Sequence, residues 1–242
     1  MIKKLIKQLI PNSFKAQWRS ALGVPSQETS FGRLQKLNYK PKLVLDIGAY
    51  EGHWAMQFHQ IFPQAKILMF EGQLAKEPKL KILQQKHLSI QYKMALLGAK
   101  KEEVTFHIYE TASSVLAEAN ETGAQLETRT LSTLDELLKG TPFVKPDFIK
   151  IDTQGYELAI LQGGLNTLAH ANVVLLEVSL LPIYEQCPLV DEVLLFMKLQ
   201  GFVLYDICSL MRRPLDEALF QSDFIFVRID SELRKDHRWT SS

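Results

Sequence analysis

The sequence predicts an α/β protein with a doubly wound, mostly parallel sheet of seven strands and an N-terminal helical extension. Short, nearly continuous apolar runs alternate with stretches of helical spacing, the pattern of strands covered by helices on both faces. Several of these runs end in an acidic residue and a turn. The last two runs have only about 15 residues between them, which is marginal for a crossover helix. The final strand is therefore expected to be antiparallel.

The expected elements follow this pattern along the chain. The strands are residues 43–47, 66–72, 89–97, 103–109, 126–130, 148–152, 172–178, 202–207 and 224–229. The helices are residues 53–61, 75–87, 132–138 (capped by Ser132), 156–162 and 191–200. Two strands, 103–109 and 126–130, interrupt the regular alternation, with a small polar loop over 111–122 between them. They are read as an insertion into the sheet.

Composition limits the class of protein. The 242 residues carry 28 basic and 27 acidic side chains, so no overall field points to a nucleic-acid partner. The length suits one domain over residues 41–230, preceded by a helical extension over 1–40 and followed by a polar tail over 231–242. Two cysteines are too few for a disulfide framework, which fits a cytoplasmic protein. No apolar run approaches the ~20 residues of a membrane-spanning helix.

Positive charge is concentrated in the N-terminal segment. Residues 1–27 hold five basic side chains and no acid, and the apolar positions between residues 2 and 10 follow helical spacing. Such a helix either docks on the domain with its lysines in water, which we favour, or lies on an anionic membrane surface. The second alternative would make the protein membrane-peripheral. Nothing in the sequence points to a particular oligomeric state.

The segment Asp46-Ile-Gly-Ala-Tyr-Glu-Gly52 is the first that carries chemistry. An acid ends the first strand and two glycines follow, which allows a sharp turn close to a ligand at the carboxyl edge of the sheet. The spacing matches neither the dinucleotide fingerprint nor the P-loop. A carboxylate beside the loop repels a pyrophosphate and suits a cationic or amine-bearing ligand.

A second acid, Glu71, ends the next strand. A carboxylate accepts hydrogen bonds only, so at this position it can hold both hydroxyls of a ribose. A positive ligand with a free ribose fits S-adenosylmethionine. The simpler alternative is that Asp46 and Glu71 each cap a helix or pair with a lysine.

Five segments together resemble the FkbM family of S-adenosylmethionine-dependent methyltransferases, over about residues 40 to 229. They are Asp46–Gly52, Phe70-Glu71, Ser113-Ser114, Thr133–Leu138 and Ile149–Leu158, within which Asp152-x-Gln-Gly-x-Glu157 is the most specific. The resemblance implies a seven-stranded sheet of order 3-2-1-4-5-7-6 in a methyltransferase domain over 41–230. It also implies methyl transfer, usually to a hydroxyl of a sugar, a cell-surface glycan or a natural product. Tyr50 and Gly72 depart from the residues that many relatives carry.

The resemblance and the strand ends together give the expected site residues. The expected cofactor-binding residues are Asp46, Gly48, Ala49, Tyr50, Glu51, Gly52, Glu71, Gly72, Ala95 and Asp152, with the adenine against residues 94–96. The expected substrate-binding residues are Ser113, Ser114, Gln154 and Glu157. For Glu157, stabilisation of the helix N-terminus through the dipole is an equal alternative.

Asp152 and Glu177 are the expected catalytic pair, because they end neighbouring strands and can act as base and orienting group. His107, on the inserted strand, is a further candidate base, although a surface histidine is the simpler interpretation. With a third ligand the two acids could instead hold Mg²⁺. The sequence offers no convincing third ligand, so a metal is not favoured.

The leading interpretation is therefore an O-methyltransferase acting on a small molecule or glycan. Methylation of nitrogen on a small molecule is the first alternative. A nucleoside-binding module without activity is the second, and the intact acids and glycines count against it. A nucleotide-dependent redox enzyme is a third, which the missing loop glycine disfavours.

Overall fold

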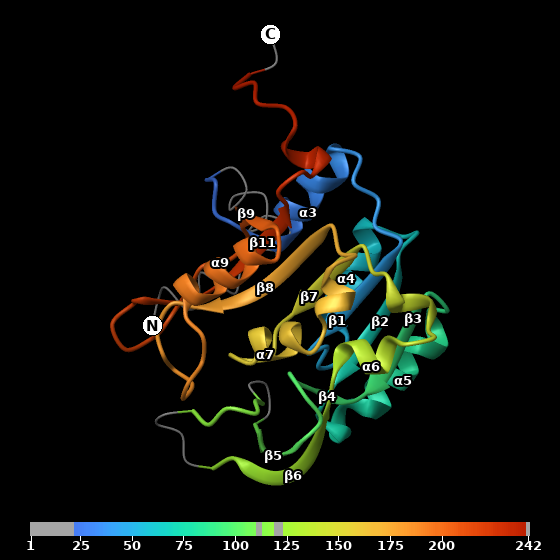
Figure 1. The fold of residues 1–242 in the computed structure, drawn as a ribbon, viewed down its shortest axis with the longest axis vertical. Coiled ribbons are helices and arrows are strands. Elements are labelled where there is room, and N and C mark those ends of the chain that lie inside the picture. Colours follow the sequence, from blue (N-terminus) through green and yellow to red (C-terminus); the bar gives the residue numbers. More distant parts are fainter. Residues whose placement is uncertain (1–21, 110–112, 119–122, 241–242) are drawn as a thin grey trace, which may run out of the picture.

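The computed structural model describes residues 22–109, 113–118 and 123–240. The predicted helix over residues 2–10 and part of the predicted loop over 111–122 lie outside the described residues. The described chain folds around one large sheet with helices on both of its faces (Figure 1). In the described residues no helix is both long and apolar enough to cross a bilayer.

The main sheet has the predicted order. Its strands are β1 (Leu43–Ile47), β2 (Lys66–Glu71), β3 (Ile90–Met94), β7 (Phe148–Ile151), β8 (Val173–Ser179), β9 (Phe202–Ile207), β10 (Met211–Arg212) and β11 (Leu219–Arg228). Strands β3, β2, β1, β7 and β8 lie side by side and parallel, and β11 follows β8. Strand β11 also pairs with β9, which gives the order 3-2-1-4-5-7-6, with the short β10 as an addition.

Strand β11 runs antiparallel to both β8 and β9, as predicted from the short connection before it. It is buried along most of its length, as a strand between two others must be. Its reversal brings the beginning of β11 to the edge of the sheet where β7 and β8 end. Residues of β11 can therefore contribute to a site at that edge.

Two layers of helices cover the sheet. Helices α3 (Gln27–Lys36), α4 (His53–Ile61) and α5 (Glu77–Lys86, preceded by the 3-10 turn Leu74–Lys76) cover one face. The other face packs against α6 (Leu134–Leu138), the 3-10 turn Pro142–Val144, α7 (Glu157–Gln162), α8 (Leu165–Leu168) and α9 (Val190–Leu199). A last 3-10 turn, Glu232–Arg234, follows β11. Each face of the sheet thus packs against an apolar core, which explains why the strands are continuous apolar runs.

Helix α3 was not among the predicted helices. Ser26 caps it by accepting a hydrogen bond from the Thr29 N–H at 3.2 Å. Phe31 and Leu34 are buried, and the Phe31 ring meets the Phe58 ring of α4 edge-on with centroids 5.1 Å apart. The described end of the N-terminal extension is therefore part of the domain core.

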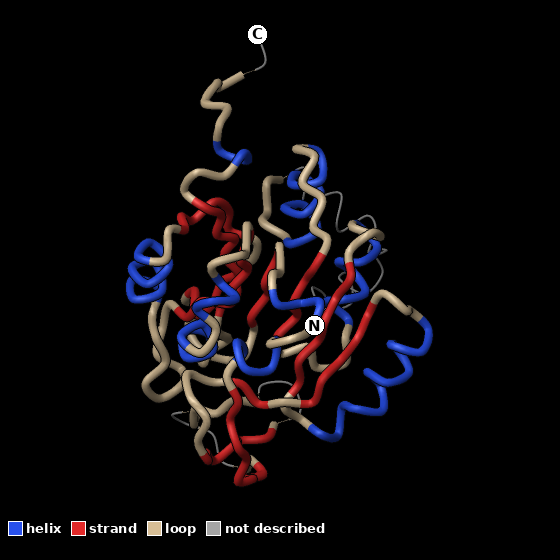
Figure 2. The backbone as a smooth tube through the Cα atoms, turned by 45° about the vertical axis from the view of Figure 1, so that its right-hand side comes forward, coloured by secondary structure: helices blue, strands red, loops and turns tan. Residues whose placement is uncertain are grey.

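The insertion forms a small sheet of its own (Figure 2). Strand β5 (Glu103–Ile108) pairs antiparallel with β6 (Gln125–Ser132), and β6 pairs parallel with β4 (Leu96–Leu97). The strand predicted over 89–97 is therefore wrong as one element: the chain leaves the main sheet at Ala95 and joins the small one. Ser132 ends β6, so the predicted cap is also wrong; Thr133 caps α6 by accepting from the Glu136 N–H.

Candidate active site

A pocket of about 280 Å³ lies at the carboxyl edge of the main sheet. It is lined by the ends of β1, β2 and β7, the chain between β3 and β4, and two parts of the insertion. The lining residues are Ile47, Gly48, Tyr50, Phe70, Glu71, Gly72, Gln73, Ala95, Leu96, Leu97, Phe106, Ser113, Ser114, Val115, Asp152, Thr153, Gln154, Tyr156 and Ile160. Two carboxylates face this pocket, Glu71 at the end of β2 and Asp152 after β7.

The loop after β1 depends on Gly48. Its φ is +75°, and a Cβ placed there would lie 1.9 Å from the Asp152 carbonyl oxygen. Any side chain at position 48 would therefore push the ends of β1 and β7 apart. Tyr50 also has a left-handed backbone, with φ +51°. This loop brings the Tyr50 N–H to Glu71, 2.7 Å from its Oε2.

Glu71 is held by the backbone on both of its oxygens. Its Oε2 accepts from the Tyr50 N–H, and its Oε1 accepts from the Gln73 N–H at 2.7 Å. Burial raises the pKa of the carboxyl, and the two N–H donors oppose that rise. A carboxylate has about four lone-pair sites, so these two bonds leave acceptor capacity for ligand hydroxyls.

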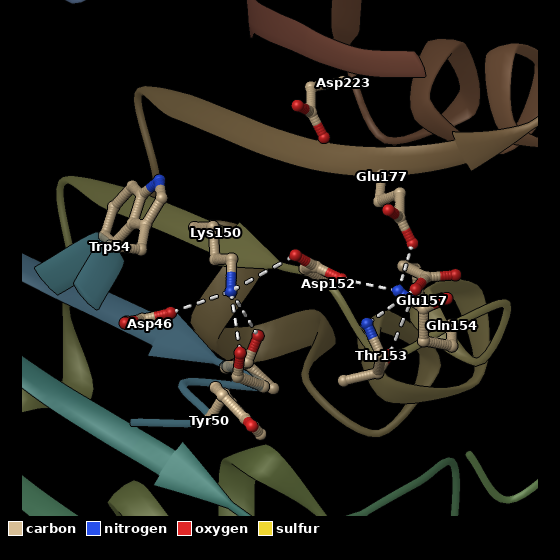
Figure 3. A network of polar contacts seen from close by, with 12 residues as sticks. Asp46, Tyr50, Trp54, Lys150, Asp152, Thr153, Gln154, Glu157, Glu177 and Asp223 are labelled. Atoms are coloured by element: carbon tan, nitrogen blue, oxygen red, sulfur yellow. Dashed lines mark hydrogen bonds and ion pairs between the residues drawn. The ribbon is translucent and has the colours of Figure 1, made fainter. Parts of the chain in front are cut away.

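Asp46 lies beneath the pocket and is fully buried. The Lys150 ammonium group is 3.0 Å from its Oδ1 and also donates to the Gly48 carbonyl at 2.9 Å (Figure 3). Burial lowers the pKa of Lys150, but the carboxylates of Asp46 and Asp152 outweigh it and the pKa rises. Asp46 is thus the counter-ion of Lys150, and it does not line the pocket.

Gln154 joins the two predicted catalytic acids (Figure 3). Its amide Nε2 donates to Asp152 Oδ1 at 3.1 Å and to Glu177 Oε2 at 2.8 Å. The Tyr184 hydroxyl donates to its Oε1 at 2.6 Å, which fixes which end of the amide faces the acids. Gln221 of β11 donates to the same oxygen of Glu177 at 3.0 Å. The structure therefore brings Asp152 and Glu177 together through one amide.

Glu157 is buried at the start of α7 and stabilises the turn before that helix. Its Oε1 accepts from the Thr153 N–H at 2.8 Å, the Thr153 hydroxyl at 3.2 Å and the Gly155 N–H at 3.2 Å. Burial raises its pKa to about 7. These contacts favour the structural alternative for Glu157 over a direct contact with substrate.

The comparison with family models decides the identity of this fold. The model described as "Methyltransferase FkbM domain" matches residues 46–204, well over half of the chain. The chain belongs to the FkbM methyltransferase family. The matched range starts at Asp46 and includes both strand-end acids of the pocket and the segment from Lys150 to Glu157.

The chain is also similar to two solved structures that are described as methyltransferases. An FkbM methyltransferase from Methylobacillus flagellatus KT is 14% identical with a TM-score of 0.48, over 76% of this chain and 43% of that one. Precorrin-6y C5,15-methyltransferase from Geobacter metallireducens GS-15 is 12% identical with a TM-score of 0.46, over 83% and 87%. The chain thus spans less than half the length of the first of these. Among curated proteins none matches the chain.

The cofactor of the FkbM domain is S-adenosylmethionine, and the lining residues fit it. Glu71, with acceptor capacity left, suits the two hydroxyls of the ribose. Asp152, whose side chain is 40% exposed, suits the positive charge of the methionine end. Apolar residues of the lining, Ala95 and Leu96 among them, suit the flat adenine.

The predicted cofactor residues divide into two groups. Gly48, Tyr50, Glu71, Gly72, Ala95 and Asp152 line the pocket. Asp46, Ala49, Glu51 and Gly52 do not. Ala49 is in the core, Glu51 pairs with Lys76 at 3.6 Å and Lys79 at 2.5 Å, and Gly52 lets α4 start close to α5.

The predicted site residues on the insertion also differ in whether they face the pocket. Phe106 lines the pocket, and the next residue along the strand, His107, points to the opposite face of β5. Ser113 and Ser114 line the pocket, but their hydroxyls bond to backbone carbonyls, of Tyr109 and Gln154 respectively. The geometry thus does not bring His107 to the acids, and it gives Ser114 a structural role.

Within the described residues, no group of three or more His, Cys, Asp and Glu side chains is arranged to hold a metal ion. Asp152 and Glu177 are joined by Gln154 without a third such ligand. The Mg²⁺ alternative gains no support from the described geometry.

Three residues of the site, Lys150, Tyr184 and Gln221, were not predicted from the sequence. Lys150 offered a signal, since a lysine inside the apolar run of residues 148–152 must be paired when buried. Tyr184 and Gln221 offered none, because each reaches the site through a long connection or a reversed strand.

Proposed function

We propose that this FkbM domain is an O-methyltransferase that methylates a hydroxyl of a sugar, a glycan or a natural product. The observation that carries the proposal is that Asp152, which faces the pocket, is joined through the Gln154 amide to the buried carboxyl group of Glu177. Asp152 is partly exposed, whereas Glu177 is buried with amide donors from Gln154 and Gln221. Asp152 is thus the acid that can reach a proton in the pocket, whereas Glu177 is fixed behind it.

The bound cofactor supplies a methyl group on a positively charged sulfur for in-line displacement. Much of the rate of such a displacement comes from orientation, which the rigid loop after β1 and the backbone-held Glu71 provide. Asp152 accepts the proton of the acceptor hydroxyl as the oxygen attacks. Gln154 holds Oδ1 of Asp152 at 3.1 Å, and Oδ2, which lies 3.8 Å from the Lys150 ammonium, accepts that proton.

The charge of the pocket favours an uncharged acceptor. None of its described lining residues is a lysine, arginine or histidine, and two are acids. A nucleic acid would bring phosphates to a wall with no basic side chain to neutralise them. A hydroxyl acceptor brings no charge, so it avoids this repulsion. Amines remain the second class to test, since Asp152 could also hold a cation.

Calorimetric titration with S-adenosylmethionine and S-adenosylhomocysteine, with and without Mg²⁺, tests the cofactor site first. We expect micromolar binding of both, independent of Mg²⁺. Methyl transfer from labelled cofactor is then measured with sugar alcohols, natural-product hydroxyls and matched amines. We expect transfer to hydroxyls that falls at least 100-fold in the Asp152→Asn variant. Transfer to the amines alone would overturn the O-methyl assignment.

A further inference from the structure

The inserted sheet is fastened to both ends of the pocket. At the Glu71 end, the Arg129 guanidinium of β6 donates to the Gly72 carbonyl at 3.1 Å, and β4 joins the small sheet directly after Ala95. At the Asp152 end, the Ser114 hydroxyl donates to the Gln154 carbonyl at 2.9 Å. The insertion is therefore a fixed wall of the cofactor pocket.

Phe106 is the aromatic residue that this wall presents to the pocket from β5. It is only 3% exposed, so its ring is held by its neighbours. A Cβ on Gly72 would lie 3.2 Å from Phe106 Cζ and 2.7 Å from Leu96 Cδ1. The missing side chain at position 72 thus lets the Phe106 ring approach the end of β2, next to Glu71.

The position of Glu71 decides which part of the cofactor lies near this ring. If Glu71 holds the ribose, the adenine lies on the side of Gly72, Leu96 and Phe106, and the amino-acid end lies toward Asp152. An aromatic ring is a favourable contact for a nucleobase, whose flat face it can cover. Leu96 and Ala95 provide apolar contact on the main-sheet side.

We propose that Phe106 of the inserted sheet contacts the adenosyl group and contributes to the selection of the cofactor. This inference rests on the proposed function, because it takes S-adenosylmethionine as the ligand of the pocket. It gives the insertion a role in cofactor binding in addition to any role toward the acceptor.

The test uses two ligands that differ at one end. S-adenosylhomocysteine has both the adenosyl and the amino-acid end, whereas 5′-methylthioadenosine has no amino-acid end. We expect Phe106→Ala to weaken both ligands by the same factor, on the order of tenfold. Phe106→Leu keeps most of the apolar volume without the ring, and we expect it to weaken both roughly threefold.

Two control variants distinguish a direct contact between Phe106 and the ligand from an indirect effect of a less firmly held insertion. Arg129→Met removes the anchor of the same wall at the Gly72 carbonyl, at a residue that does not line the pocket, and both affinities should stay within about twofold of wild type. Asp152→Asn should weaken S-adenosylhomocysteine and leave 5′-methylthioadenosine unchanged. Thermal melts of every variant establish that the domain is folded, and Phe106→Leu decides the matter if Phe106→Ala does not fold.

The outcomes distinguish failure of the proposed function from failure of the role proposed for Phe106. Wild-type protein that binds neither ligand would overturn the proposed function and this inference with it. Wild-type binding with unchanged affinities in folded Phe106 variants would overturn the inference alone. A loss in Phe106→Ala confined to S-adenosylhomocysteine, or an equal loss in Arg129→Met, would do the same. Equal loss for both ligands in the Phe106 variants alone supports it.

Discussion

Lys150 is the residue on which the centre of the site depends. It is a buried cation of β7 among several buried carboxylates, and its ammonium group contacts Asp46 and two backbone carbonyls at the end of β1. Removing one partner of a buried ion pair leaves the other charge uncompensated, which is more costly than losing the pair's attraction. The role of Asp46 is therefore to balance Lys150.

We predict that Lys150→Met lowers the free energy of unfolding by about 3–5 kcal/mol, because Asp46 is then buried without a cation. The double variant Lys150→Met/Asp46→Asn should recover more than half of that loss. Urea unfolding of the wild type and the variants measures both effects. A single variant as stable as wild type, or a double variant no better than the single, would contradict this account of the pair.

Helix α3 shows how an element outside the matched family range becomes part of the domain. Phe31 and Leu34 lie on one side of the helix and pack with the aromatic rings of α4 and β7. The Gln27 amide donates to Asp223 at 2.8 Å and accepts from the Trp54 indole. The helix thus closes the face of the sheet that bears Lys150.

We predict that Phe31→Ala destabilises the domain by about 3–5 kcal/mol, the range for removing a buried aromatic ring. Leu37→Ala is the matched control, since Leu37 follows the same helix and is largely exposed; it should change stability by less than about 0.5 kcal/mol. Thermal unfolding of the full chain provides the comparison. Equal effects of the two substitutions would mean that α3 is not part of the cooperative core.

The net charge of the whole molecule is near zero, but acidic side chains are in local excess at one edge of the sheet. Asp46, Glu71, Glu157, Glu177 and Asp223 are all buried at or near the carboxyl edge, and burial raises the pKa of each. Lys150 is the buried cation among them. The folded chain therefore binds protons that the unfolded chain releases.

We expect stability to fall as the pH rises from about 5 to 8. For Glu157, the pKa is about 7 when folded and near 4.5 when unfolded, so its contribution is complete below 4.5 and lost by about 7. That difference amounts to about 3 kcal/mol. Glu157→Gln should remove this part of the pH dependence, as measured by urea unfolding at several pH values. An unchanged slope in the variant would show that Glu157 does not carry the proton.

The sequence pattern predicted the strand segments, the reversed last strand and the pocket acids Glu71 and Asp152, whereas the order of the main sheet was implied by the family resemblance. The physical reason is locality: an apolar run bounded by turn residues defines a strand, and its last residue is set at the carboxyl edge. Gly48 predicted a sharp turn after β1. The structure shows why a glycine is needed there, since the Asp152 carbonyl oxygen occupies the space of a side chain.

Which of the motif residues face the pocket depends on the tertiary structure. Asp46 and Asp152 both follow apolar runs in the sequence, yet one is beneath the loop with Lys150 and the other faces the pocket. The insertion, the break at Ala95 and the approach of Phe106 to Gly72 depend on pairing between strands far apart in the chain. Such pairing depends on packing across the whole domain, and a local pattern of residues does not predict it.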